Sequence, residues 1–223
     1  MEPGRAAIVV AGGPAPPPAV AALLPATAYV VAADSGVDHA HALGLRIDVA
    51  IGDFDSVSAA GLAALERSGT PCERHPAAKD ATDFELAVAL ALRHRPDHLL
   101  VVGSAGGRLD HLLGMLAVLA GPGTVALQVE ALLDRSRVSV VRSRAALRGR
   151  VGELVSLIPL HGRVTGVTTA GLRWPLVDAD LDVGSSLGVS NEFAAGSAGV
   201  QVTRGTLLVV QPDALTDPST EDS

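Results

Sequence analysis

Residues 99–123 read LLVVGSAGGRLDHLLGMLAVLAGPG, and this stretch decides the class of fold. Leu99–Val102 has the length and β-branched content of a short buried strand. A glycine-rich loop follows it, and Asp110–Ala120 then has the length and apolar content of a helix. Gly121-Pro122-Gly123 ends that helix, because proline cannot continue it. The stretch therefore predicts a strand–loop–helix unit, which is the repeating element of parallel sheets.

The same alternation extends over residues 1–130. Because strands and helices alternate, we predict an α/β domain with a doubly wound, mostly parallel, Rossmann-like sheet and helices on both faces. The further strands are expected at Ala6–Ala11, Tyr29–Ala33, Val49–Ile51 and Thr124–Leu127, and the further helices at Val37–Leu43, Ala59–Arg67 and Thr82–His94.

From about Arg135 the pattern changes to short strand-like runs separated by glycine-bearing turns. An antiparallel β-sandwich or barrel is the simplest interpretation, and we assign residues 131–211 to a sandwich domain. The acidic, polar tail, residues 212–223, is expected to be disordered. The expected strands are Val138–Val141, Leu154–Ile158, Arg163–Thr169, Gly199–Thr203 and Thr206–Val210.

Composition narrows the classes of partner. The 223 residues are 48% hydrophobic and carry a formal net charge of −7, which argues against a nucleic-acid or anionic-membrane partner. No apolar stretch reaches membrane-spanning or signal length, so we expect a cytoplasmic protein. The single cysteine, Cys72, excludes an internal disulfide, and no Cys/His cluster has zinc spacing.

Asp53 and Asp55 follow the strand expected to end at Ile51. In an extended segment, residues two apart point the same way, so both carboxylates can serve one Mg²⁺ ion, which prefers oxygen ligands. The alternative is a loop whose polar residues cap the helix near Ala59.

Residues 79–85 read KDATDFE and open a helix. Thr82 and Glu85 match a capping box, and Asp83 complements the helix dipole, which is a structural explanation. It leaves Lys79 and Asp80 unexplained, and it does not prevent Asp83 from facing a metal.

In the loop before Asp110, glycines such as Gly107 allow backbone N–H groups to approach a phosphate at a helix N-terminus, and Arg108 can clamp phosphate oxygens. The loop is neither a Walker A motif nor a dinucleotide fingerprint. A tight turn with Asp110 as N-cap is the alternative.

The acidic residues share a position in the predicted fold. Asp34, Asp53, Asp55 and Asp110 each lie just beyond an expected strand, and Asp83 opens a helix in the same half. Ligands of doubly wound sheets bind beyond the carboxyl ends of the strands, and acids gathered there repel one another unless a cation is present. We therefore predict a magnesium-dependent enzyme that transfers a phosphoryl or pyrophosphoryl group from a nucleotide.

These segments, in this order, resemble the thiamine pyrophosphokinase (thiamine diphosphokinase) family. The resemblance spans nearly the whole chain except the tail. The segments that carry it are ADSG at 33–36, GDFDS at 52–56, KDATDFE at 79–85, GRLDH at 107–111, GLRWPL at 171–176, GSSLGVSNEF at 184–193 and GTLLVV at 205–210.

The resemblance implies that ATP and thiamine react to give AMP and thiamine diphosphate, in a dimer with sites between subunits. It implies an N-terminal catalytic domain and a C-terminal thiamine-binding sandwich. Asp53, Asp55, Asp83 and Asp110 are then the catalytic and Mg²⁺-binding acids. The implied nucleotide-binding residues are Asp34, Lys79, Asp80, Thr82, Gly107 and Arg108.

For thiamine, the resemblance implies Trp174 as a flat wall against the rings, with Ser190 and Asn191 as hydrogen-bonding partners. Without it, Trp174 is explained as a core or domain-interface aromatic, and Ser190-Asn191 as a turn. The chain departs from the family pattern at Ser35, Asp38 and Met115, where the family often has glycine, asparagine and asparagine.

Two other functions are compatible with parts of the sequence. A pyrophosphokinase for another alcohol, such as a hydroxymethylpterin, shares the acidic crevice but not the Trp174 and 185–193 segments. A non-catalytic regulator that binds a nucleotide or thiamine diphosphate predicts binding without turnover.

Overall fold

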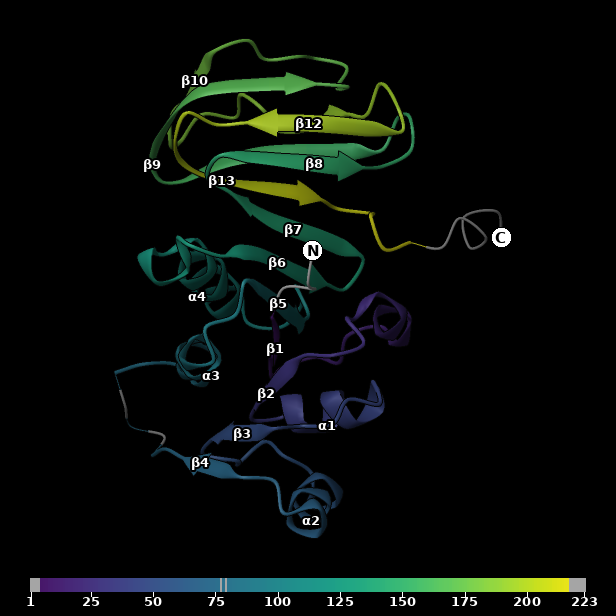
Figure 1. The fold of residues 1–223 in the computed structure, drawn as a ribbon, viewed down its shortest axis with the longest axis vertical. Helices are drawn as coiled ribbons and strands as arrows, with labels where there is room; N and C mark the ends of the chain where they lie inside the picture. Colours follow the sequence, from purple (N-terminus) through teal and green to yellow (C-terminus); the bar gives the residue numbers. More distant parts are fainter. Residues whose placement is uncertain (1–4, 77, 79, 217–223) are drawn as a thin grey trace. The chain divides into compact units, whose positions relative to one another are not determined.

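The computed structural model describes residues 5–76, 78 and 80–216, so the predicted phosphate ligand Lys79 lies outside the described residues. The chain has a mixed α/β fold, as predicted (Figure 1). It divides into two compact units, which we describe separately. The N-terminal unit comprises the residues up to Met115 together with Ala126–Asp134, and the C-terminal unit comprises Leu116–Val125 and the residues from Arg135 onward.

The N-terminal unit is built on a parallel sheet, in which every recorded strand pair is parallel. The strand order is β4-β3-β2-β1-β5-β6, and the direction of winding reverses between β1 and β5. In doubly wound sheets such a reversal marks the crevice where ligands bind. The strands are β1 Ala6–Val10, β2 Tyr29–Ala33, β3 Val49–Gly52, β4 Cys72–Arg74, β5 His98–Gly103 and β6 Gln128–Leu133.

Helices cover both faces of this sheet, because its central strands are apolar on both sides. Ile8, Val9 and Val10 are fully buried. In Figure 1, α1 and α2 lie on one face, and α3 and the start of α4 lie on the other. The helices are α1 Gly36–Ala42, α2 Ala59–Ser68, α3 Asp83–Arg93 and α4 Leu109–Ala120, with short 3₁₀ turns at Pro18–Leu23 and Pro122–Thr124.

One predicted strand is wrong. Thr124–Leu127 does not form a strand, and β6 begins only at Gln128. The Thr124 hydroxyl donates to the carbonyl oxygen of Leu119 at 2.7 Å, which holds it in the turn that ends α4. The predicted stop at Gly121 is confirmed, since α4 ends at Ala120. Strand β4 was not predicted, because Cys72-Glu73-Arg74 is a polar, largely exposed edge strand.

From Arg135 onward the C-terminal unit consists of strands, and its recorded pairs are antiparallel. The two strands predicted at 154–158 and 163–169 are one element, β9, with 17 residues. It pairs with β13 along residues 156–165 and with β12 along 168–170. The strands are β7 Ser136–Val141, β8 Arg144–Arg148, β9 Leu154–Ala170, β10 Ala179–Leu181, β11 Asn191–Glu192, β12 Ser197–Gln201 and β13 Arg204–Gln211.

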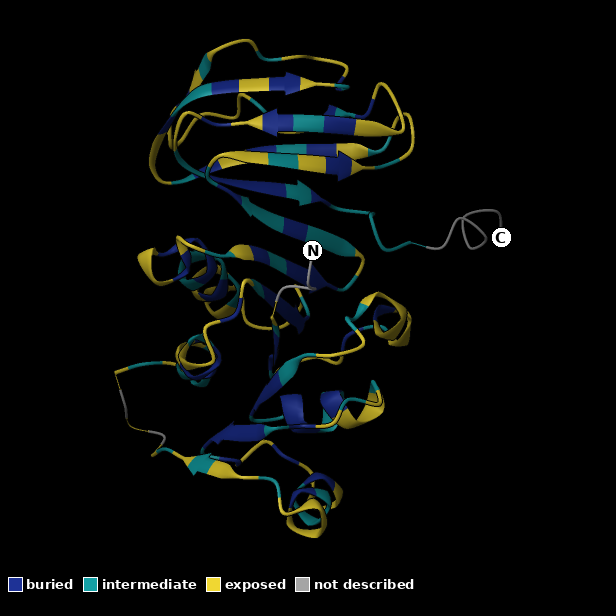
Figure 2. Ribbon diagram, viewed as in Figure 1, coloured by how far each residue is buried: buried dark blue, intermediate teal, exposed yellow. Residues whose placement is uncertain are grey.

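Inward-facing residues of these strands form a separate hydrophobic core that includes Val155, Leu157, Leu181 and Phe193. Figure 2 shows the resulting alternation of buried and exposed residues along the strands. Phe193 is 1% exposed and lies against Gly149, where a Cβ atom would stand 2.6 Å from the ring. A larger residue at position 149 therefore cannot fit without displacing this ring.

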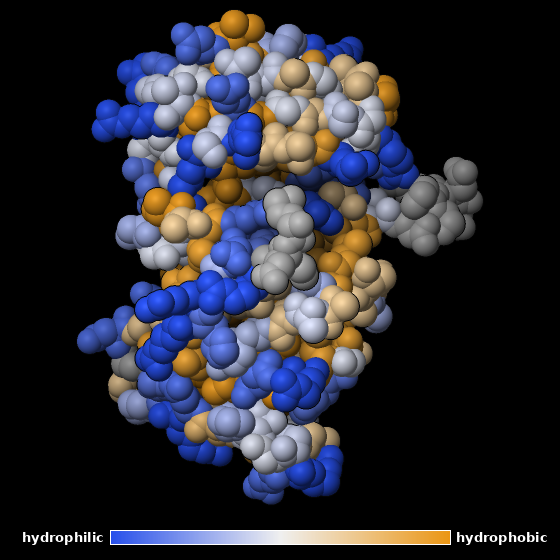
Figure 3. Space-filling model, viewed as in Figure 1, coloured by the Kyte–Doolittle hydropathy of each residue, from blue (hydrophilic) through white to orange (hydrophobic). Residues whose placement is uncertain are grey.

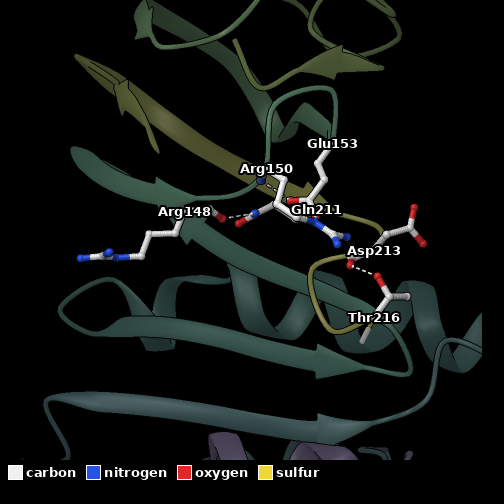
Figure 4. Close-up of polar contacts among 6 residues, drawn as sticks. All are labelled: Arg148, Arg150, Glu153, Gln211, Asp213 and Thr216. Atoms are coloured by element: carbon white, nitrogen blue, oxygen red, sulfur yellow. Dashed lines mark hydrogen bonds and ion pairs between the residues drawn. The ribbon is translucent and has the colours of Figure 1, made fainter. Parts of the chain in front are cut away.

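The last described residues are tied to the same unit. The buried Gln211 amide donates to the carbonyl oxygen of Arg148 at 2.9 Å, and the Thr216 hydroxyl donates to that of Asp213 at 2.6 Å (Figure 4). Arg135 pairs with the Asp213 carboxylate at 3.3 Å. Residues 212–216 of the expected tail thus make defined contacts, and residues 217–223 lie outside the described residues.

The N-terminal unit carries the single thiol of the chain. Cys72 is free and exposed on the edge strand β4, and its Sγ donates to the carbonyl oxygen of Thr70 at 3.4 Å. Partial burial raises the pKa of this thiol. Within the described part of the chain, no helix has the length and apolar character needed to cross a membrane.

Candidate functional site

The N-terminal unit brings three of the predicted acids together beyond β2 and β3. Asp34 follows β2 in a left-handed conformation, with φ of 46°. Its Oδ1 accepts the Phe54 N–H at 3.2 Å, and its carboxyl group hydrogen-bonds to that of Asp83 at the start of α3. The Asp53 carboxylate is near enough to influence Asp34 electrostatically. We call Asp34, Asp53 and Asp83 the acidic cluster.

The acidic cluster changes the ionisation of one of its members. Burial raises the pKa of Asp34 from its ordinary value of 3.8 to about 6, and the charges of Asp83 and Asp53 add to the rise. The Phe54 N–H opposes the rise because it stabilises the carboxylate. A hydrogen bond between two carboxyl groups needs a proton on one of them, which a bound cation can replace.

The raised pKa of Asp34 predicts a pH-dependent stability. A folded-state pKa above the unfolded value gives stability that is present below about pH 4 and is lost as the pH rises through about 6. Asp34→Asn carries no charge at any of these pH values and suits a positive φ. In EDTA, we expect the melting temperature of Asp34→Asn minus that of wild type to increase from pH 4 to pH 7. A difference that is constant with pH would contradict the raised pKa.

The segment after β3 is a turn rather than the extended chain assumed from the sequence. Phe54 has a φ of 66°, which is rare for a bulky residue. The Asp53 Oδ1 accepts the Asp55 N–H at 3.0 Å, and Asp55 is exposed. The prediction that Asp53 and Asp55 point the same way through strand alternation is therefore wrong in its geometry. Strained backbone of this kind is found mainly at functional sites.

Phe54 itself is held by packing. Its side chain is buried, and the Arg74 guanidinium lies 4.7 Å from the centre of its ring. Arg74 ends β4, and the next residue, His75, donates its N–H to the carbonyl oxygen of Gly52 at 3.0 Å. Sequence reasoning missed Arg74, because the polar edge strand that carries it gives no apolar pattern.

Gly52, the last residue of β3, lies directly against the Asp34 carboxyl group of the acidic cluster. It has a φ of 143°, and a Cβ atom built there would stand 1.9 Å from the Asp34 Oδ1. Only glycine therefore allows the Asp34 carboxyl group to lie against the end of β3.

Helix α3 begins as predicted. Thr82 is its N-cap and accepts the Glu85 N–H through its hydroxyl at 3.1 Å, so Asp83 occupies the first helical position. Asp80 is exposed in the preceding turn. The cap and the cluster are compatible functions of one segment, because Thr82 fixes the helix terminus that presents Asp83.

The glycine-rich loop after β5 lies beside the loop after β1. Cβ atoms built on Gly106 and Gly107 would stand 3.8 Å and 3.2 Å from side-chain atoms of Pro14. The Ser104 hydroxyl accepts the Gly106 N–H at 2.9 Å, and Asp134 accepts that of Ala105 at 2.9 Å. These two loops flank the point where the winding of the sheet reverses.

Arg108 and Asp110 form a bidentate ion pair at this edge. Arg108 donates to both Asp110 oxygens, at 3.2 Å and 2.6 Å. The hydrogen bonds from Arg108 lower the pKa of Asp110 to about 2. Both side chains are mainly exposed, so the pair is available to exchange partners with a ligand.

The donor chemistry of the acidic cluster fits Mg²⁺, because carboxylate oxygens are its preferred protein ligands. The mutual hydrogen bond of Asp34 and Asp83 also fits a place where positive charge is needed. Among the described residues, however, no three His, Cys, Asp or Glu side chains already form a metal-binding group.

The three departures from the family pattern have structural roles. The Ser35 hydroxyl accepts the Gly13 N–H at 3.0 Å. The Asp38 carboxylate accepts hydrogen bonds from the Ser58 N–H, at 2.9 Å, and from the Ser58 hydroxyl, at 2.6 Å. Asp38 therefore supports the start of α2. Met115 is buried.

In the C-terminal unit, Trp174 and Asn191 are in direct contact. Asn191 is 4% exposed, and its Oδ1 accepts the N–H groups of Trp174, at 3.1 Å, and Glu192, at 2.9 Å. Its Nδ2 donates to the carbonyl oxygen of Trp174 at 2.7 Å. Trp174 is 51% exposed, so it is not the core aromatic that the sequence left open.

Asn191→Ala tests how much these Asn191 hydrogen bonds contribute to stability. It leaves two N–H groups and one carbonyl near Trp174 without their side-chain partner, so we expect a loss of about 2–4 kcal/mol of unfolding free energy. Urea titration monitored by circular dichroism measures it. Ser190→Ala is the control, because Ser190 is exposed and its recorded bond, to the Ser156 hydroxyl at 3.0 Å, uses the backbone N–H. Equal stability of both variants would contradict a stabilising role of the Asn191 hydrogen bonds.

Further apolar side chains are exposed along the segment from Trp174 to Ser190. Figure 3 shows apolar residues interrupting the hydrophilic surface of this unit. Ser190 has a φ of 57° and ends this segment, immediately before β11. The exposed apolar side chains are Trp174, Val177, Val183, Leu187 and Val189.

Comparison with known proteins agrees with both units. The model of the thiamin pyrophosphokinase catalytic domain matches residues 20–130, and that of the thiamin pyrophosphokinase vitamin B1 binding domain matches residues 142–207. Together they cover well over half of the 223 residues. The chain belongs to the thiamin pyrophosphokinase family.

Individual members of the family are distant in sequence and close in fold. Thiamine pyrophosphokinase from Bacillus subtilis is 26% identical over 164 residues, which are 73% of this chain and 77% of that protein. Its crystal structure covers 93% of this chain and 98% of its own, with a TM-score of 0.83 and 24% identity. The thiamin pyrophosphokinase structure from Geobacillus thermodenitrificans covers 96% of this chain and 99% of its own, with a TM-score of 0.79 and 27% identity.

Proposed function

We propose that this chain performs the reaction of its family, transferring the pyrophosphoryl group of ATP to the hydroxyl of thiamine to give thiamine diphosphate and AMP. The observation that carries the proposal is the acidic cluster at the carboxyl ends of β2 and β3, within a chain matched by both family domains. We describe the N-terminal domain, residues 1–130, as Rossmann-like and the domain at 131–211 as a thiamine-binding β-sandwich. The reversal of winding at β1 and β5 and the antiparallel pairs after Arg135 support this description.

In this proposal, Asp53, Asp55, Asp83 and Asp110 hold Mg²⁺, directly or through water. When bound, the ion neutralises charge on the polyphosphate. The protein's own contribution is mainly to place the reacting groups and to compensate charge. Arg108 and Lys79 hold phosphate oxygens. Asp34, Asp80, Thr82 and Gly107 complete the nucleotide site.

Asp34 has a second function in this arrangement. It joins the turn after β3 to the N-terminus of α3, because it bonds to Phe54 and to Asp83. It thereby fixes the separation of the Asp53 and Asp83 carboxylates.

Thiamine binds against Trp174 in the C-terminal domain, with Ser190 on the same segment. Asn191 has all its recorded bonds to backbone groups, so its contribution is chiefly to hold Trp174. The exposed apolar side chains along 174–189 support a homodimer with sites between subunits, which light scattering on a gel-filtration column tests. The net charge of −7 supports small-molecule partners over nucleic acid or a membrane surface, and we place the enzyme in the cytoplasm.

A product assay tests the function. Purified protein is incubated with ATP, Mg²⁺ and thiamine, and AMP and thiamine diphosphate are quantified by chromatography, with EDTA and no-thiamine controls. Equal amounts of both products, formed only with thiamine, support the proposal. Turnover with a hydroxymethylpterin instead of thiamine would favour another pyrophosphokinase, and ligand binding without any turnover would favour a regulator.

A further inference from the structure

Trp174 is fixed by more than its backbone. The Arg173 guanidinium lies over the indole, 4.9 Å from the ring centre. Arg173 is itself held, because its Nη1 donates to the Glu192 carboxylate at 2.7 Å. The Arg173 N–H also donates to the carbonyl oxygen of Glu192 at 2.8 Å. A backbone bond and an ion pair thus join the same two residues.

This arrangement has a consequence for the indole ring. The orientation of a half-exposed tryptophan ring depends on the groups that pack against it, and the bonds from Asn191 restrain only the backbone of Trp174. The Arg173 guanidinium adds a restraint on the ring itself, since a planar cation stacks on an aromatic face and attracts its electrons. It also occupies one face of the ring, so an aromatic ligand has only the opposite face.

We propose that Arg173, held by Glu192, is a positioning residue that sets the orientation of Trp174 before thiamine binds and leaves one indole face for the ligand. The inference rests on the proposed function for the identity of the ligand. It does not rest on that function for the order of the indole, which is a property of the protein without ligand.

Trp174 is the only tryptophan, so its fluorescence reports on this site alone. Arg173→Met keeps a long apolar side chain but removes the guanidinium, and Arg173→Lys keeps the charge without the planar group. Glu192→Gln removes the ion pair. Arg163→Met is a matched control, because Arg163 also forms exposed ion pairs in this unit, with Asp180 and Asp182.

Without ligand, we expect the fluorescence anisotropy of Arg173→Met to fall and acrylamide quenching to increase. Glu192→Gln and Arg173→Lys should show smaller changes, and Arg163→Met should match wild type. With substrates, Arg173→Met should raise the KM for thiamine about 3- to 10-fold and leave kcat and the KM for ATP nearly unchanged, because the change affects binding.

Unchanged anisotropy and quenching in ligand-free Arg173→Met would overturn the proposal, even if the KM rose, because Arg173 would then act by contacting the substrate. A fall in kcat with no change in the KM for thiamine would also overturn it. Failure of the proposed function gives a different result: wild-type protein would form no thiamine diphosphate, while the ligand-free fluorescence would still decide whether Arg173 orders the indole.

Discussion

Asp53→Ala is expected to lower kcat for thiamine diphosphate formation by about 100- to 1,000-fold or more, the range that follows removal of one group that stabilises transition-state charge. Asp53 lies in the acidic cluster, and its side chain also shapes the turn by accepting the Asp55 N–H. Stability should fall by only about 1 kcal/mol, because a single hydrogen bond in a partly exposed turn is lost. Steady-state kinetics and urea titration measure the two effects.

Asp97→Ala is the matched control for Asp53→Ala. Asp97 also accepts one backbone N–H, that of Arg5 at 2.8 Å, but it precedes β5 and so lies at the opposite edge of the sheet. We expect a similar small loss of stability with unchanged kcat. Undiminished turnover in Asp53→Ala would remove Asp53 from the site.

Gly52→Ala is expected to damage both stability and activity. The new Cβ atom would stand 1.9 Å from the Asp34 Oδ1, so the carboxyl group must leave its position beside Phe54 and Asp83. The φ of 143° adds backbone strain. We expect a loss of about 2–4 kcal/mol of unfolding free energy and turnover close to background. Chemical denaturation and the product assay measure these effects.

Gly44→Ala separates the effect of the Cβ contact with Asp34 from the effect of backbone strain. Gly44 also has a positive φ, of 72°, but a Cβ atom there meets nothing within 4 Å. This variant should lose only about 1–2 kcal/mol, the cost of the left-handed backbone alone, and keep its activity. If Gly52→Ala behaved in the same way, the contact between Gly52 and Asp34 would not support the site.

The elements of the N-terminal unit could largely be predicted because their signals are local. The apolar run at 29–33 and the Thr82 cap fix β2 and the start of α3 through neighbouring residues alone. The strand predicted at Thr124–Leu127 failed for a different reason. The Thr124 hydroxyl satisfies the end of α4, and a competition between a side chain and the backbone does not appear in apolar periodicity.

For the candidate site, the sequence indicated which acids lie near one another but not the local backbone geometry. The positions of Asp34, Asp53 and Asp83 relative to the expected strands placed them at one edge of the sheet. The turn after β3 places Phe54 in a left-handed conformation, and its buried ring packs against the Arg74 guanidinium, a residue 20 positions away in the sequence. Such tertiary contacts have no sequence pattern, and the guanidinium of Arg173 over Trp174 is missed for the same reason.

The exposed thiol on β4 gives the molecule a built-in spectroscopic ruler. Cys72 is the one cysteine and lies in the N-terminal unit, whereas Trp174 is the one tryptophan and lies in the C-terminal unit. A dye that accepts energy from indole, coupled to Cys72 at alkaline pH because burial raises the pKa of the thiol, creates a donor–acceptor pair with one member in each unit. Energy transfer in the wild-type sequence can then follow the separation of the two units as ATP or thiamine is added, without any engineered labelling site.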